Sequence, residues 1–169
     1  MPILSYEGEY EVSDLGRSRS VERTVVVERG GSIFERKYRS RYLSPVISNG
    51  QGHLAVTLSR KGSYHRALIH HLVLEAFVEP RPPSLFGLHR DDDPANNTLP
   101  NLYWGTKRDN QLDKVRNGNH HNTLKTHCPQ DHEYTEENTR WVTKKNGDQA
   151  RRCIICIRRI ARESYHRRK

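Results

Sequence analysis

Apolar and polar residues alternate in several short stretches of the first 65 residues, and this period-two pattern predicts half-buried β-strands. The clearest stretches are residues 10–12, 24–27 and 54–58. Residues 60–63, Arg-Lys-Gly-Ser, have the composition of a hairpin turn and lead into a further strand at 64–68. We therefore expect a β-rich N-terminal module over residues 1–65.

The period changes at Ile69, where apolar residues begin to recur at helical spacing and continue as far as Pro80. This spacing predicts a short amphipathic helix that packs on the sheet. His70 and His71 lie inside this apolar helix. We expect them to be core or helix-surface residues and not members of a site.

Residues 85–118 have the order strand, polar loop, strand, helix. The stretches are a strand at 85–89, a loop at 91–100 and a strand at 102–104. Thr106 can cap the helix that follows, with Asp109 as its capping-box partner and Gly118 at its end. The pattern predicts a ββα unit at the centre of a second part, residues 66–121.

Charge and composition point to a polyanionic partner and a thin core. The 169 residues include 29 Lys and Arg against 20 Asp and Glu, a net charge of +9, and residues 144–169 hold ten of these basic side chains against two acidic ones. Such a block favours contacts with nucleic-acid phosphates, although a solvated tail would have the same composition. The hydrophobic fraction is only 33%, so a bound metal is an expected source of additional stability.

Neither a signal peptide nor a membrane span is readable in the sequence. The three cysteines are an odd number without a secretion signal, which favours reduced thiols in a cytosol-like compartment. We therefore expect no membrane partner.

Three polar residues of the ββα unit lie at fixed offsets: His89, Asn101 twelve residues later and Asn110 nine after that. With the stretch from Leu88 to Asn97, this spacing resembles the HNH endonuclease family, in the branch with Asn as the last letter. Upstream, residues 6–20 resemble a NUMOD4-like DNA-binding element that is often fused to these homing-type nucleases. The resemblance to the nuclease family covers about residues 68 to 121.

The resemblance implies a metal-dependent endonuclease that hydrolyses DNA phosphodiester bonds, and the residue types suit this chemistry. His89 would activate water, because imidazole is the side chain that titrates closest to neutral pH. Asn110 would offer its amide oxygen to Mg²⁺ or Mn²⁺, which prefer hard oxygen ligands. By resemblance, Asn101 would fix the imidazole or the loop that carries it.

The sequence departs from the family pattern at Leu88, where some relatives have an Asp as a second metal ligand. Asp91 is the first substitute, since on a continuing strand it would share the face of His89. Asp93 is a weaker substitute. A single protein ligand, completed by water and phosphate oxygens, is the remaining arrangement.

A second constellation lies nearer the C-terminus: Cys128 and His132, then Cys153 and Cys156. Two close pairs of thiolate and imidazole ligands predict a closed, tetrahedral structural Zn²⁺ site. A redox-active pair or plain reduced thiols are the alternatives, and His127 or His166 could replace His132 as the fourth ligand.

Two groups of arginines are candidates for DNA contacts. They are Arg17, Arg19 and Arg23 near the N-terminus, and Arg151, Arg152, Arg158 and Arg159 in the tail. Arg17, Arg19 and Val21 would share one strand face, and a solvated edge strand is the alternative for them.

The sequence as a whole predicts an α+β protein in three parts, of which residues 122–169 form a zinc-ribbon-like basic tail. We expect double-stranded DNA as partner, no small-molecule cofactor, and a monomer or weak dimer. Resemblance to phage-borne relatives implies a bacterial cytoplasm. The main alternative is a DNA-binding or packaging-accessory protein that keeps the fold without cutting, and a zinc-dependent RNA-binding protein is a third.

Overall fold

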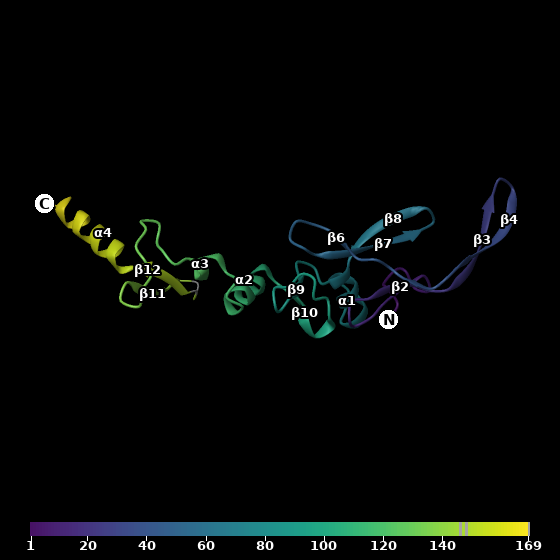
Figure 1. Ribbon diagram of the computed structural model, residues 1–169, viewed down its shortest axis with the longest axis horizontal. Coiled ribbons are helices and arrows are strands. Elements are labelled where there is room, and N and C mark those ends of the chain that lie inside the picture. The colour runs from purple at the N-terminus through teal and green to yellow at the C-terminus, as the bar shows by residue number, and fades with distance from the viewer. Residues whose placement is uncertain (146, 148, 169) are drawn as a thin grey trace. The chain divides into compact units, whose positions relative to one another are not determined.

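The computed structural model describes residues 1–145, 147 and 149–168, and the chain divides into two compact units, residues 1–119 and residues 120–169 (Figure 1). The strands of the first unit are β1 (Tyr10–Val12), β2 (Ser18–Ser20), β3 (Arg23–Arg29), β4 (Ser32–Tyr38), β5 (Arg41–Tyr42), β6 (Val46–Ile47), β7 (Leu54–Arg60), β8 (Ser63–Leu68), β9 (Phe86–His89) and β10 (Leu102–Gly105). Its helices are α1 (Ile69–Phe77), the short 3₁₀ turn η1 (Leu99–Asn101) and α2 (Lys107–Arg116). The second unit contains α3 (His121–Leu124), β11 (Thr139–Thr143), β12 (Gln149–Cys153) and α4 (Ile154–His166).

Small antiparallel sheets make up the first unit. The strand orders are β1-β2-β5, β6-β7-β8, β3-β4 and β9-β10. The predicted turn at 60–63 joins β7 to β8, where Arg60 pairs with Ser63. The mixture of antiparallel sheets and helices confirms the α+β class predicted from the sequence.

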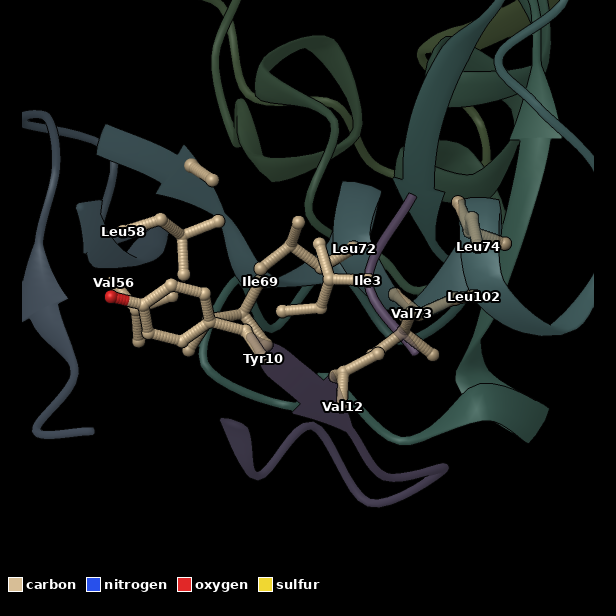
Figure 2. Packing of buried hydrophobic residues seen from close by; sticks show 11 residues of the cluster. Ile3, Tyr10, Val12, Val56, Leu58, Ile69, Leu72, Val73, Leu74 and Leu102 are labelled. Atoms are coloured by element: carbon tan, nitrogen blue, oxygen red, sulfur yellow. The ribbon is translucent and has the colours of Figure 1, made fainter. Parts of the chain in front are cut away.

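Helix α1 is the element on which the first unit is assembled. Its residues Ile69, Leu72 and Val73 are buried against Val12 of β1 and other apolar side chains of the same cluster (Figure 2). The full cluster is Ile3, Tyr10, Val12, Val56, Leu58, Ala67, Ile69, Leu72, Val73, Leu74 and Leu102. The sequence predicted a boundary between residues 65 and 66, but this core contains residues from both sides of it. The two N-terminal parts therefore form a single compact unit.

The ββα unit has the predicted elements at nearly the predicted positions. β9 and β10 pair antiparallel, with His89 opposite Leu102 and Leu88 opposite Tyr103. Helix α2 begins after Thr106, which forms the predicted capping box with Asp109. The hydroxyl of Tyr103 donates a hydrogen bond to Asp113 and thereby ties β10 to α2.

The second unit consists mainly of the β11–β12 hairpin and α4. Arg140 of β11 lies opposite Arg152 of β12, and Cys153 ends β12 and caps α4. No helix in the described parts of the chain has the length and apolar character needed to cross a membrane.

Candidate active site and metal centre

His89 is a buried imidazole at the last position of β9, with 6% of its surface exposed. Its Nε2 lies 3.4 Å from Oδ1 of Asn97, while Nδ2 of Asn97 donates to the carbonyl of Ala95. The amide of Asn97 is thus oriented with its oxygen toward the ring. Burial lowers the pKa of His89 below the usual 6.5, and the contact with Asn97 only partly opposes this shift.

Two further histidines, neither of them predicted as a site residue, lie beside His89. The ring centroid of His70 is 5.0 Å from that of His89, and the centroid of His53 is 5.5 Å away. Burial is the main cause that lowers the pKa of His70 to about 2. Sequence spacing gave no signal for this convergence, because the packing of α1 against the hairpin creates it.

Gly87 of β9 allows this close packing. A Cβ atom at position 87 would lie 2.7 Å from Cδ2 of His70 and 2.9 Å from Cδ2 of His71. Real Cβ atoms do not approach that closely, so a side chain at this position would push α1 away from β9.

Asn101 fixes the loop that follows His89. Its Oδ1 accepts a hydrogen bond from the backbone N–H of Asp91, and its Nδ2 donates to Oδ1 of Asp91 and to the carbonyl of Asn96. This geometry agrees with a role in holding the loop. The residue that touches the imidazole itself is Asn97, which the sequence analysis did not select.

Asp91 was predicted to share the strand face of His89. This prediction was wrong, because β9 ends at His89 and the alternation of side-chain faces does not extend to Asp91. Asp91 lies in the turn instead. Its carboxylate accepts hydrogen bonds from the N–H of Asp93, from Asn96 and from Asn101. Its observed contacts therefore stabilise the loop.

Asn110 lies on α2, on the face that packs against the hairpin. Asn110, Asp113 and Asn117 recur at helical spacing, and the amide of Asn117 donates to the carbonyl of Arg90 at 2.8 Å. The side-chain amide of Asn110 is half-buried and has no hydrogen-bond partner among the described residues. Its oxygen is therefore available to a cation.

The two faces of the hairpin separate His89 from Asn110. Tyr103, which bonds to α2, lies opposite Leu88, whereas Leu102 in the α1 core lies opposite His89. Since successive side chains of a strand point to opposite faces, Leu88 faces α2 and His89 faces α1. Leu88 is 7% exposed and places an apolar side chain, not a carboxylate, on the α2 face.

The four predicted zinc ligands converge in the second unit. Nδ1 of His132 lies 3.5 Å from Sγ of Cys128, 3.7 Å from Sγ of Cys153 and 3.3 Å from Sγ of Cys156. The Sγ atoms of Cys128 and Cys156 are 3.7 Å apart. For a tetrahedral Zn²⁺, bond lengths of about 2.0–2.3 Å place the ligand atoms about 3.3–3.8 Å apart, so this Cys₃His set fits such an ion.

Backbone and amide hydrogen bonds hold these ligands in place. The N–H of Cys156 donates to Sγ of Cys153, and the N–H of Gln130 donates to Sγ of Cys128. Asn138 is buried and its Oδ1 accepts from the N–H of Ile155 at the start of α4. His127, one alternative fourth ligand, contacts Thr126 instead and is not part of the cluster.

The three N-terminal arginines differ in exposure and in their contacts. Arg17 and Arg19 are exposed and line the same shallow depression, where Arg19 pairs with Glu11 at 2.7 Å. Arg23 is turned inward, because its guanidinium donates to Glu9 and lies over the ring of Tyr38 at 4.4 Å. Arg23 therefore has a structural role in the first unit, and a contact between Arg23 and DNA stays a prediction.

The tail arginines divide in the same way. Arg151 lies over the ring of Tyr134 at 4.0 Å and donates to the carbonyls of Asn122 and Lys125, so it stabilises the second unit. The remaining three expected DNA contacts, Arg152, Arg158 and Arg159, are exposed.

The fold and the site define a chain with a ββα unit of the HNH type, a β-rich N-terminal part and a Cys₃His cluster. A family model for the NUMOD4 motif matches residues 1–59. This match confirms the NUMOD4-like element expected near the N-terminus. The resemblance to HNH homing-type endonucleases is confirmed by the similarity to the two proteins described next.

Two known proteins are similar to this chain. An uncharacterized HNH endonuclease of Acanthamoeba polyphaga mimivirus is 26% identical over 91 residues, which are 54% of this chain and 27% of that protein. The chain therefore spans about a quarter of the length of this relative. The HNH homing endonuclease I-HmuI, solved in a study of its DNA binding and cleavage, superposes with a TM-score of 0.54 at 20% identity, covering 90% of this chain and 76% of that one. This chain has the same fold.

Proposed function

We propose that the protein is a metal-dependent DNA endonuclease in which His89 is the general base. The observation that carries this proposal is the environment of His89: a buried imidazole with a lowered pKa, at a strand end, held by Asn97. A base of this kind is neutral at physiological pH and able to accept a proton. The similarity to HNH endonucleases supports the same reaction.

The hydrogen-bond network indicates which nitrogen of His89 acts. Nδ2 of Asn97 donates to Ala95, so Oδ1 of Asn97 accepts from Nε2–H of His89. The neutral ring then keeps Nδ1 unprotonated. Nδ1 would take the proton of the water that attacks the phosphorus, while the bond to Asn97 stabilises the imidazolium that forms.

A hard divalent cation, Mg²⁺ or Mn²⁺, fits the amide oxygen of Asn110. When bound, such an ion would neutralise charge on the phosphate and on the departing 3′ oxygen. Leu88 supplies no ligand, so water and phosphate oxygens would complete the coordination.

Exposed arginines provide contacts for double-stranded DNA. Arg140 and Arg152 lie directly opposite each other across β11 and β12, with no ion pair to either among the described residues. Like charges at such positions repel, and a shared phosphate would relieve the repulsion. Arg17 and Arg19 offer a second positive site in the first unit.

The Cys₃His cluster holds Zn²⁺ in this proposal. Its ligand distances match the ion, and the second unit has few buried apolar residues of its own, so metal binding would supply much of its folding free energy.

The proposal is tested by incubating the protein with supercoiled plasmid in Mg²⁺, in Mn²⁺ and in EDTA. Relaxed or linear DNA that disappears with EDTA supports the endonuclease. A shifted band without product in either metal supports a second function, a DNA-binding protein that does not cut.

The buried Leu88 is the observation that favours this second function, because it removes a carboxylate from the α2 face. The variant Leu88→Asp would restore that ligand beside Asn110, with Leu88→Ala as the control for the lost apolar packing. A gain of cleavage in Leu88→Asp alone, with an inactive parent chain, would decide for the non-cleaving protein.

A further inference from the structure

Three histidines from three separate elements meet in the first unit: His53 just before β7, His70 in the first turn of α1 and His89 at the end of β9. One ligand nitrogen from each lies within 4.8 Å of the others. The ring centroids are 5.0 Å apart for His53 and His70, 5.5 Å for His53 and His89, and 5.0 Å for His70 and His89. We call these three residues the histidine triad.

Two nitrogens of the triad are buried without a partner. Nδ1 of His53 and Nδ1 of His70 have no hydrogen bond to any described residue, and His70 is only 3% exposed. A buried polar atom left unpaired costs about 1–3 kcal/mol, so a histidine that merely fills the core would be expected to bond through both nitrogens. The unpaired nitrogens indicate a missing partner.

We propose that the histidine triad binds a divalent transition-metal ion that prefers imidazole, with Zn²⁺ as the representative ligand. Imidazole nitrogens suit Zn²⁺, Ni²⁺ and Cu²⁺, whereas Mg²⁺ prefers oxygen. Three nitrogens of a tetrahedral Zn²⁺ site lie about 3.3 Å apart, which small rotations of the three rings would reach from the observed separations. The fourth position is left for water.

The charge state of the triad is compatible with this site. Burial lowers the pKa of each of the three imidazoles, so they are neutral and their lone pairs are available. The charged groups that act on them are Arg81, Asp91 and Asp93, and the carboxylates favour a cation near His89.

An ion in the triad would occupy His89. This consequence rests on the proposed function: if His89 is the base, bound Zn²⁺ prevents it from accepting a proton and inhibits cleavage in Mg²⁺. The triad would then make the activity sensitive to the transition metals present.

The experiment counts metal in the full-length protein after equilibration with Zn²⁺ in a large excess of Mg²⁺. His53→Phe removes one ligand and keeps a flat ring, and His65→Phe is the matched control because His65 is exposed on β8. We expect His53→Phe to hold one Zn²⁺ fewer per chain than the parent and the control. Equal metal content in all three proteins would overturn the proposal, whether or not the Cys₃His cluster is filled.

Thermal unfolding provides a second measurement that does not depend on counting. Added Zn²⁺ should raise the unfolding temperature of the first unit in the parent and in His65→Phe, but not in His53→Phe, since only bound metal stabilises the native state. An equal rise in His53→Phe would contradict the triad.

A cleavage assay separates this inference from the proposed function. Inhibition by Zn²⁺ in His65→Phe that is weakened at least tenfold in His53→Phe would support both. Absence of any cleavage by the parent chain would refute the endonuclease and leave the metal count as the decisive test of the triad.

Discussion

The positions of the candidate site residues in the first unit depend partly on motif spacing, which the sequence shows, and partly on tertiary contacts, which it does not show. The positions of His89 at the end of β9 and of Asn101 beside the following loop were predictable, because their spacing has the form of a known motif. Asn97 and His70 were not, since their importance comes from contacts across the fold: Asn97 reaches back to the ring, and α1 brings His70 to it. The contact between Arg23 and Glu9 was not predictable, because a strand pattern does not show it.

His89 should be essential for cleavage. His89→Ala removes the proposed base, and general-base catalysis contributes about 10²–10⁴-fold, so we expect at least a hundredfold loss of plasmid cleavage. DNA affinity, measured by band shift, should change little, because no phosphate contact is removed. Undiminished cleavage by the variant would exclude His89 as the base.

The cleavage rate should fall only at a pH below the ordinary value for histidine. The base must be neutral, and burial lowers the pKa of His89 beneath 6.5, so protonation and loss of rate occur as the pH drops through that lowered value. Single-turnover rates between pH 4.5 and 8 in Mg²⁺, with transition metals removed, would show the acid limb. A limb centred above pH 6.5 would contradict the assignment.

At the scale of elements, the ββα unit was predictable because local signals define each piece. Short apolar stretches at 85–89 and 102–104 predict β9 and β10, and the capping box of Thr106 and Asp109 fixes the start of α2. The hairpin of β11 and β12 was not recognised from the sequence. Most of its residues are polar and only Cys153 is buried, so the hairpin has no apolar pattern by which it could be recognised.

The second unit should depend on its metal. Cys128→Ser removes a ligand whose Sγ lies within 3.7 Å of both Cys156 and His132, and elemental analysis should show one Zn²⁺ fewer per chain. Both the Cys128→Ser substitution and chelation of the parent protein should lower the protease resistance of residues 120–169. Gln130→Ala is a suitable control, because it keeps the backbone N–H that bonds to Cys128.

At the scale of the whole molecule, the excess positive charge would govern the DNA binding that the proposed function requires. The net charge of +9 was readable at once, and ten basic residues were located in the tail. The sequence could not show which arginines are free, because Arg23 and Arg151 are held by protein groups while Arg152 and Arg17 are exposed.

DNA binding should weaken steeply with salt, and exposed arginines should account for the slope. Each phosphate contact contributes about 0.9 to the dependence of log affinity on log salt. Changing Arg140 and Arg152 to Ala together should reduce the slope by up to about 2, measured by fluorescence anisotropy on a DNA duplex. The pair Glu136→Ala and Glu137→Ala is the control, and an unchanged slope in the arginine variant would remove the hairpin from the interface.

The division of the chain at residues 119 and 120 also has an evolutionary consequence. The first unit relies on an apolar core around α1, and the second has three cysteines and one histidine that suit a single ion. The C-terminal segment that follows residue 119 could therefore be exchanged for another by recombination without disturbing the apolar core around α1, next to which His89 lies. Lineages that carry the same first unit would then be free to acquire different C-terminal segments, and with them different DNA contacts if the proposed function holds.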